Sequence, residues 1–214
     1  MQIDHRRHVK DIASANEAAK SVLESCGVDF CCKGEASLRE ACINAEVDPT
    51  EIEQKLRDLP DVPAPTWEDV ASLVDHVVEA CHPATRDAIL HARSVAAHGP
   101  LGQALEALQR SAFALMHDDE VLFRHVRALA AARAGRGPFP PPPLATVRAQ
   151  TQRLREAHAH LHDQLRNVRA IARSPEIDTI PVRRAIDHLA HALVEQMHLV
   201  NNELLPRARD LEPQ

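Results

Sequence analysis

Two neighbouring cysteines are the residues whose type and spacing most directly suggest chemistry. Cys31 and Cys32 follow Asp29 and precede Gly34, in a stretch typical of a turn. A pair of thiolates can bind iron, accept or transfer a nitrosyl group, or cycle through oxidation. The alternative is that a cysteine is a small apolar side chain packed in a core, which suits Cys42 on its apolar stripe. Two consecutive side chains in a turn rarely both face inward, so we assign the chemistry to Cys31 and Cys32.

Polar side chains at core positions of predicted helices form a second group of candidates. They come from separate parts of the later chain: His82, His98, Asp118, Asp119, His158 and Gln196. Imidazole nitrogen and carboxylate oxygen converging from several helices suit iron, and also zinc or manganese. Taken alone, each histidine is better explained as a hydrogen-bonded core residue. Taken together, these residues favour a metal site.

The composition indicates an all-α protein. Apolar residues make up 44% of the chain and aromatic residues only 2%, and alanine, leucine and valine dominate, as in helical domains. The net charge is −6 and the scattered arginines offer no basic face, so we expect no nucleic-acid partner. No nucleophile–base arrangement and no phosphate-binding glycine loop supports a hydrolase or kinase.

The cysteine count and the chain's apolar runs bear on where the protein works. Five cysteines, two of them neighbours, suit reduced thiols or a reactive site better than a disulfide framework. The charged first ten residues are followed by no apolar signal segment, and no later run is long enough to span a bilayer. We therefore expect a cytoplasmic protein without a membrane partner.

The elements that position the cysteines form a small N-terminal domain over residues 1–59. Apolar spacing predicts a first helix over about 9–25. A capping box at Ser37 and the Asp48 cap before a proline predict two more helices. In this three-helix unit the cysteines lie in the turn after the first helix. Residues 60–65, which follow the unit, form a proline-rich linker.

The elements that position the histidines form a predicted four-helix bundle over residues 66–210. Its first helix begins at Thr66, and we expect a kink or break where Pro83 follows the first histidine. In the second helix, apolar residues alternate steps of three and four, and one acid, Asp119, interrupts this pattern. A proline-rich crossover leads to the last two helices, which end at Pro206.

The chain resembles a known family at its cysteine motif. Asp29-Phe30-Cys31-Cys32, followed by Ser37-Leu38 and Ala41-Cys42, is similar to the N-terminal domain of the repair-of-iron-centres (RIC) proteins. These are bacterial di-iron proteins also called YtfE, ScdA or DnrN. Residues 66–210 resemble their haemerythrin-like bundle, most specifically at Asn201-Asn202. The resemblance implies a cytoplasmic stress protein that responds to nitric oxide and peroxide, holds non-haem iron and helps to restore iron-sulfur clusters.

The resemblance also implies specific metal ligands. His82, His98 and His158 fall where the family has histidine ligands, and Asp118, a shorter carboxylate, falls where it has a bridging glutamate. Three positions depart from the family's di-iron ligands: Ala114 and Gln196 stand for histidines, and Val200 stands for a bridging glutamate. Two residues on nearby helix faces are alternatives for the missing ligands: His117 and Glu203. What remains could hold one metal ion, or none.

Three functions stay open at this point. The first is an iron-binding stress protein that repairs iron-sulfur clusters damaged by nitric oxide or oxidants, with iron-sulfur proteins as clients. The second is a degenerate bundle that has lost its di-iron centre and acts as a regulatory or interaction module. The third is a site that reversibly binds nitric oxide or dioxygen. A homodimer is an open alternative for the oligomeric state.

Overall fold

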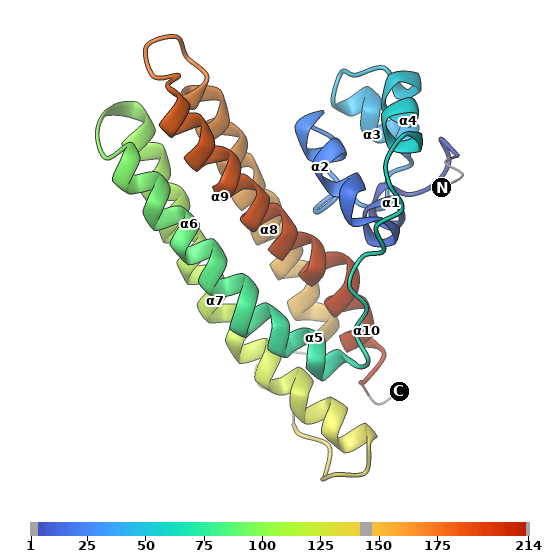
Figure 1. Ribbon diagram of the computed structural model, residues 1–214. Helices are drawn as coiled ribbons and strands as arrows, with labels where there is room; N and C mark the ends of the chain where they lie inside the picture. Colours follow the sequence, from blue (N-terminus) through green and yellow to red (C-terminus); the bar gives the residue numbers. More distant parts are fainter. Residues whose placement is uncertain (1–3, 142–146, 213–214) are drawn as a thin grey trace. The chain divides into compact units, whose positions relative to one another are not determined.

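The computed structural model describes residues 4–141 and 147–212, and this part of the chain is all-α (Figure 1). Within it the backbone forms helices and a single isolated bridge between His8 and Ser37, without a strand. The chain divides into two compact units, Met1–Trp67 and Glu68–Gln214. The expected order, a small helical domain followed by a helical bundle, is confirmed. Among the described helices we find none with the length and apolar character of a membrane span.

The N-terminal unit contains one more helix than expected. Its helices are α1 (Val9–Ala15), α2 (Glu17–Ser25), α3 (Leu38–Asn44) and α4 (Pro49–Arg57). The prediction of one helix over 9–25 is wrong because the backbone of Asn16 is extended, with φ −143° and ψ 117°. Its Oδ1 accepts from the amide of Ala18 at 3.0 Å, and its Nδ2 donates to the carbonyl of Pro60 at 2.9 Å. A short amide side chain thus competes with the helix for backbone hydrogen bonds and begins a new one.

The other predicted helix starts in this unit are confirmed. Ser37 and Glu40 form the reciprocal capping box of α3, and the side chain of Asp48 caps α4 before Pro49. Gly27 follows α2 with φ +73°, a left-handed geometry that costs glycine little. The loop that carries Cys31 and Cys32 therefore lies between the end of α2, followed by Gly27, and the capped start of α3 at Ser37.

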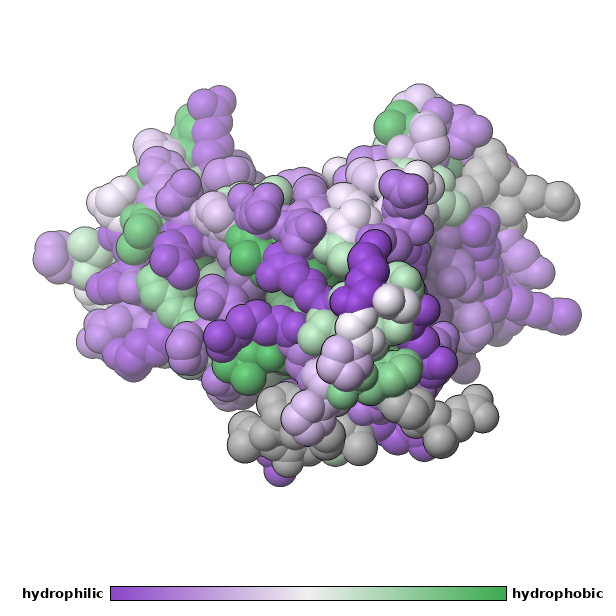
Figure 2. Space-filling view, turned by 90° about the horizontal axis from the view of Figure 1, so that it is seen from below, coloured by the Kyte–Doolittle hydropathy of each residue, from purple (hydrophilic) through white to green (hydrophobic). Residues whose placement is uncertain are grey.

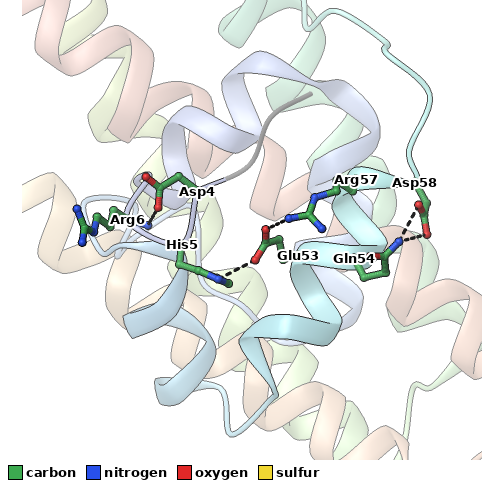
Figure 3. Close-up of polar contacts among 7 residues, drawn as sticks. All are labelled: Asp4, His5, Arg6, Glu53, Gln54, Arg57 and Asp58. Carbon is green, nitrogen blue, oxygen red and sulfur yellow. Dashed lines mark hydrogen bonds and ion pairs between the residues drawn. The ribbon is translucent and has the colours of Figure 1, made fainter.

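A buried carboxylate joins the N-terminal segment to α4 (Figure 3). Glu53 is 7% exposed, and its Oε2 lies 2.8 Å from Nε2 of His5. Its other oxygen pairs with Arg57, one helical turn later. Around it, apolar side chains form the core of this unit: Val9, Ile12, Leu23, Val28, Phe30, Leu38, Ile52 and Leu56. The small unit is thus held by an apolar core and a few buried polar contacts.

The second unit is a bundle of four long helical segments. They are α5 (Val70–His76) continued by η1 (Val77–Cys81) and α6 (His82–Val95); α7 (Gly99–Arg133); α8 (Val147–Ala172); and α9 (Ile180–His198) continued by η2 (Leu199–Leu204) and α10 (Leu205–Arg209). In Figure 1, α6 runs antiparallel to α9 and α7 runs antiparallel to α8, and these pairs pack together. The first helix begins after Asp69, which forms a capping box with Ser72, and not at Thr66.

Two π-helical turns carry the bundle helices through prolines. The amide of His82 bonds to the carbonyl of Val77, five residues back, and Pro83 follows. The amide of Leu205 bonds in the same way to Val200, and a proline follows there too. A proline lacks an amide hydrogen and crowds the preceding turn, and the wider π-turn accommodates it. The helix therefore does not break at Pro83, and the last helix continues past Pro206, where its end was predicted.

The face of the molecule drawn in Figure 2 is mainly hydrophilic, with apolar residues in separate places. The large apolar side chains that are exposed in the described residues come from distant parts of the sequence: Ile43, Val62, Leu90, Phe139 and Ile180. Isolated residues of this kind are normal on a protein surface. The polar groups buried inside each unit are therefore the stronger candidates for a functional site.

Candidate functional site

The first candidate site is the thiol cluster, formed by Asp29, Cys31 and Cys32 in the loop between α2 and α3. The two sulfur atoms lie 3.4 Å apart. Oδ1 of Asp29 accepts from Sγ of Cys31 at 3.4 Å and from the amide of Cys32 at 2.8 Å, and the amide of Lys33 adds a contact at 3.4 Å. One ligand atom from each of the three residues lies within 4.8 Å of the others. The loop thus presents two sulfurs and one oxygen at one point.

The two thiols of this cluster differ in burial and in proton affinity. Cys31 is 1% exposed, whereas Cys32 is half-buried. The pKa of Cys31 lies well above that of an ordinary cysteine, chiefly because of its hydrogen bond with Cys32 and then because of burial. The charges of Cys32 and Asp29 raise it further. Cys31 therefore keeps its proton at neutral pH until a metal ion displaces it.

The remaining cysteines lie outside this cluster. Cys42 is fully buried, and burial, followed by the charges of Cys26 and Asp48, raises its pKa to about 11. Its position in the core agrees with the packing role that its apolar stripe indicates. All five cysteines belong to the described residues, and none of them forms a disulfide there.

The second candidate site lies inside the bundle, where α6 begins. His82 is 5% exposed, and its ring stacks on Phe123 with 6.2 Å between the ring centroids. Its Nε2 lies 3.7 Å from Oδ2 of Asp119, which comes from α7 and is fully buried. This distance is longer than a hydrogen bond, so the two groups face each other without a direct bond.

A second histidine approaches the same point from α8. His158 is fully buried, and its Nδ1 lies 2.8 Å from Oδ1 of Asn201, in the π-helical turn η2. Burial lowers the pKa of His158, and the charge of His82 adds to that effect. The charge of Asp119 and the contact with Asn201 oppose it. The four residues His82, Asp119, His158 and Asn201 therefore form one buried polar cluster, in which His158 is neutral at physiological pH.

Several polar atoms of the buried polar cluster have no hydrogen-bond partner among the described residues. They are Nε2 of His82, both carboxylate oxygens of Asp119 and Nε2 of His158; Oε1 of Gln196 shares this property. Burying a carboxylate without a partner costs several kcal/mol. In the described part of the chain, only the ligand atoms of the thiol cluster all lie within 4.8 Å of one another. Those of His82, Asp119 and His158 do not, so the arrangement does not present three converging metal ligands.

The structure does not bring all four predicted metal ligands together. His98 is exposed at the N-terminal cap of α7. Asp119 comes 21 residues later, which is about 30 Å along an α-helix. Asp118 is exposed, and its neighbour Asp119 takes the buried position. Of the four, only His82 and His158 are buried inside the bundle, and the buried acid beside them is Asp119.

The positions of the missing family ligands hold groups that cannot complete a di-iron centre. Ala114 is exposed and Val200 is fully buried, and neither has a donor atom in its side chain. His117 is exposed, and on a helix it lies on the opposite side from Asp119. Glu203 pairs with Arg207 at 2.8 Å. A non-haem di-iron centre therefore does not fit this bundle.

A cavity of about 270 Å³ lies between α7 and α8, beside Asp119 of the buried polar cluster. Asp119 lines it together with Asp118, and from α8 come Arg153 and Ala157. Its other walls are Leu115, Val121, Leu122, Gln150 and Leu154. Asp119 thus contributes to the wall of a partly polar cavity, while its carboxylate oxygens are themselves buried.

Comparison with known protein families gives one match. Residues 5–60 match the family model ScdA_N, which is described as a Domain of Unknown function (DUF542). The matched range contains α1 to α4 and the whole thiol cluster. The comparison therefore applies to the N-terminal unit.

Proposed function

We propose, from the match of residues 5–60 to the ScdA_N model and from the resemblance of the chain to the RIC proteins, that it is an iron-binding stress protein. It helps to repair iron-sulfur clusters damaged by nitric oxide or oxidants in the cytoplasm. Iron-sulfur proteins are its clients, and the thiol cluster carries the chemistry.

The observation that carries this proposal is the convergence of two sulfurs and one carboxylate in the matched domain. Sulfur ligands suit iron, and the contacts from the amides of Cys32 and Lys33 fix the carboxylate of Asp29 beside them. Half-buried Cys32 is the sulfur that an incoming ion meets first. The buried thiol of Cys31 then gives up its proton as the ion, which is cargo here, is bound.

Return of the proton to the thiol of Cys31 promotes release of the bound iron ion. Because the pKa of Cys31 is raised, protonation of this thiol competes with the ion at neutral pH. Binding loses protons and release regains them, without a change of oxidation state in the protein. Such a site holds iron loosely enough to pass it to a damaged cluster.

The experiment measures recovery of an iron-sulfur dehydratase after treatment with nitric oxide, with the purified full-length chain added. A Cys31→Ala, Cys32→Ala double variant should restore little activity. Cys26→Ala is the matched control, because this half-buried thiol lies in the same unit but outside the thiol cluster. Full recovery with the double variant would refute the proposal.

The interaction module is the second candidate, and the residues at the di-iron positions favour it. Val200 is a buried apolar side chain where the family has a bridging glutamate, so that position packs without a metal. This candidate predicts that rescue does not depend on the cysteines and that a chelator does not change the melting temperature. A fall in the melting temperature after chelation would argue against it.

A further inference from the structure

We propose that the thiol cluster also binds trivalent arsenic, supplied as arsenous acid, through one sulfur–arsenic bond to Cys31 and one to Cys32. Arsenic in this state is a soft atom that prefers thiol sulfur to nitrogen or oxygen, and it bonds to three ligands. This ligand differs from the iron cargo of the proposed function. The inference stands without that function, because it rests only on the geometry and chemistry of the site.

The number of ligand atoms is the first argument for arsenic. Asp29, Cys31 and Cys32 place one ligand atom each within 4.8 Å of the others, and no further histidine, cysteine or acid among the described residues joins them. Sulfur-rich sites for zinc or iron usually take four protein ligands, which this cluster does not supply. A three-coordinate atom that carries a lone pair needs only two sulfurs and one oxygen.

The distance between the two sulfur atoms is the second argument. Bonds from sulfur to arsenic are about as long as the zinc–sulfur bond of about 2.3 Å. Around a tetrahedral ion with bonds of that length, two sulfurs lie about 3.8 Å apart. The sulfurs of Cys31 and Cys32 lie 3.4 Å apart, which corresponds to an angle of about 95° at the bound atom. Such a narrow angle is typical of a pyramidal atom with a lone pair.

The proton balance of the reaction is the third argument. Two arsenic–oxygen bonds break and two arsenic–sulfur bonds form, and each thiol proton leaves with a hydroxyl group as water. Arsenic stays in the trivalent state, so no oxidant or reductant is needed. The pKa of Cys31 is raised by its hydrogen bond with Cys32 and by burial, so its thiol carries the proton that this reaction consumes. A divalent ion must instead displace that proton into solution.

Asp29 gives the bound arsenic its third contact. Its Oδ1 accepts a hydrogen bond from Sγ of Cys31 at 3.4 Å and one from the amide of Cys32 at 2.8 Å. When Cys31 loses its proton, the hydroxyl group that stays on arsenic replaces the thiol as a donor to this oxygen. Cys32 is half-buried and Cys31 is buried, so arsenous acid meets the sulfur of Cys32 first.

The test measures binding of sodium arsenite to the full-length chain by equilibrium dialysis and elemental analysis. A phosphine keeps the protein reduced, because a dithiol reductant would compete for arsenic. We expect one arsenic per chain. Cys32→Ser should weaken binding about 100- to 10,000-fold, because the remaining sulfur–arsenic bond loses the help of a second thiol held beside it. Cys26→Ser is the matched control, a half-buried thiol of the same unit outside the thiol cluster, and should bind like the wild type.

The pH dependence separates arsenic from a divalent ion. Arsenite affinity should stay nearly constant between pH 6 and about 8, whereas zinc affinity rises about tenfold per pH unit for each proton that the ion displaces. An arsenite affinity that rises as steeply as that of zinc would contradict the proposed proton balance.

Alkylation followed by peptide mass spectrometry locates the bound arsenic. Arsenite should protect Cys31 and Cys32 together and leave Cys26 as reactive as before, and circular dichroism shows whether each variant folds. Wild-type affinity in Cys32→Ser, or an equal loss in Cys26→Ser, would overturn the proposal. Failure of the repair function would appear in the dehydratase assay and leave arsenite binding unchanged.

Discussion

Nδ1 of His158 lies 2.8 Å from Oδ1 of Asn201, and this contact joins the centre of α8 to the π-helical turn η2. The other π-turn, η1, ends directly before His82. Both sides of the buried polar cluster are thus built where a helix widens by one residue per turn. Such turns are frequent at functional sites, because they change which side chains face inward.

Removing the amide of Asn201 should destabilise the bundle. In Asn201→Ala the buried imidazole of His158 loses its hydrogen-bond partner, so we expect the free energy of unfolding to fall by about 1–3 kcal/mol. Urea denaturation measures this loss.

Asn202→Ala is the matched control for this experiment. Asn202 is half-buried and contacts Nδ1 of His198 at 3.1 Å, outside the buried polar cluster. Its removal should cost less stability, because water can replace the contact of a half-buried side chain. Equal losses in Asn201→Ala and Asn202→Ala would show that the contact with His158 adds no stability of its own.

Without metal, the carboxylate of Asp119 should destabilise the bundle. Asp119→Leu removes a buried charge, and the adjacent cavity gives the larger side chain room. We expect the free energy of unfolding in chelator to rise by about 1–3 kcal/mol. Asp118→Leu, at an exposed position, should change it by less than about 0.5 kcal/mol. Urea denaturation measures both, and a loss of stability in Asp119→Leu would show that the carboxylate is already compensated.

The features that were predictable from sequence are those fixed by neighbouring residues. The capping box at Ser37 and the cap at Asp48 depend on side chains within three positions, so they were correctly predicted. The break at Asn16 was missed because its side chain also bonds to Pro60, 44 residues away. Local patterns do not contain such a contact.

The candidate ligands illustrate the same limit inside the bundle. The three–four spacing of the second bundle helix already placed Asp119 among core positions, but the family resemblance pointed to Asp118. Periodicity was the better guide because it reports burial directly. The exposure of His98 depends on where one helix ends and the next begins, which the sequence pattern alone does not fix.

Replacing Asn16 should lower the free energy of unfolding of the N-terminal unit, although its side chain is small. Its side chain is 2% exposed and makes contacts with both Ala18 and Pro60. Asn16→Ala leaves those groups without their partner, so we expect a loss of about 1–3 kcal/mol. Asn44→Ala, at an exposed position at the end of α3, is the control. Equal effects of the two substitutions in urea denaturation would contradict the role assigned to Asn16.

Metal binding to the thiol cluster should strengthen as the pH rises. The pKa of Cys31 is raised by its hydrogen bond with Cys32 and by burial, so its thiol is protonated at neutral pH. Each proton that a metal displaces makes the affinity about tenfold higher per pH unit. In an Asp119→Asn background, zinc affinity between pH 6 and about 8 should therefore rise more steeply than in the same chain with Cys31→Ser. Parallel slopes would mean that Cys31 is not a ligand.

Cys42 should make the N-terminal unit sensitive to alkaline pH. Burial raises its pKa to about 11 in the folded chain, above the reference value of 9.0. The neutral thiol is thus favoured on folding, so its contribution is complete below about pH 9 and is lost as the pH rises towards 11. The shift corresponds to at most about 2–3 kcal/mol. Cys42→Ala lacks this titration, so the stability advantage of the wild type over the variant should shrink by up to that amount from pH 8 to about 11. Urea denaturation at each pH gives the difference, and a difference that stays constant would show that Cys42 titrates alike in the folded and unfolded chains.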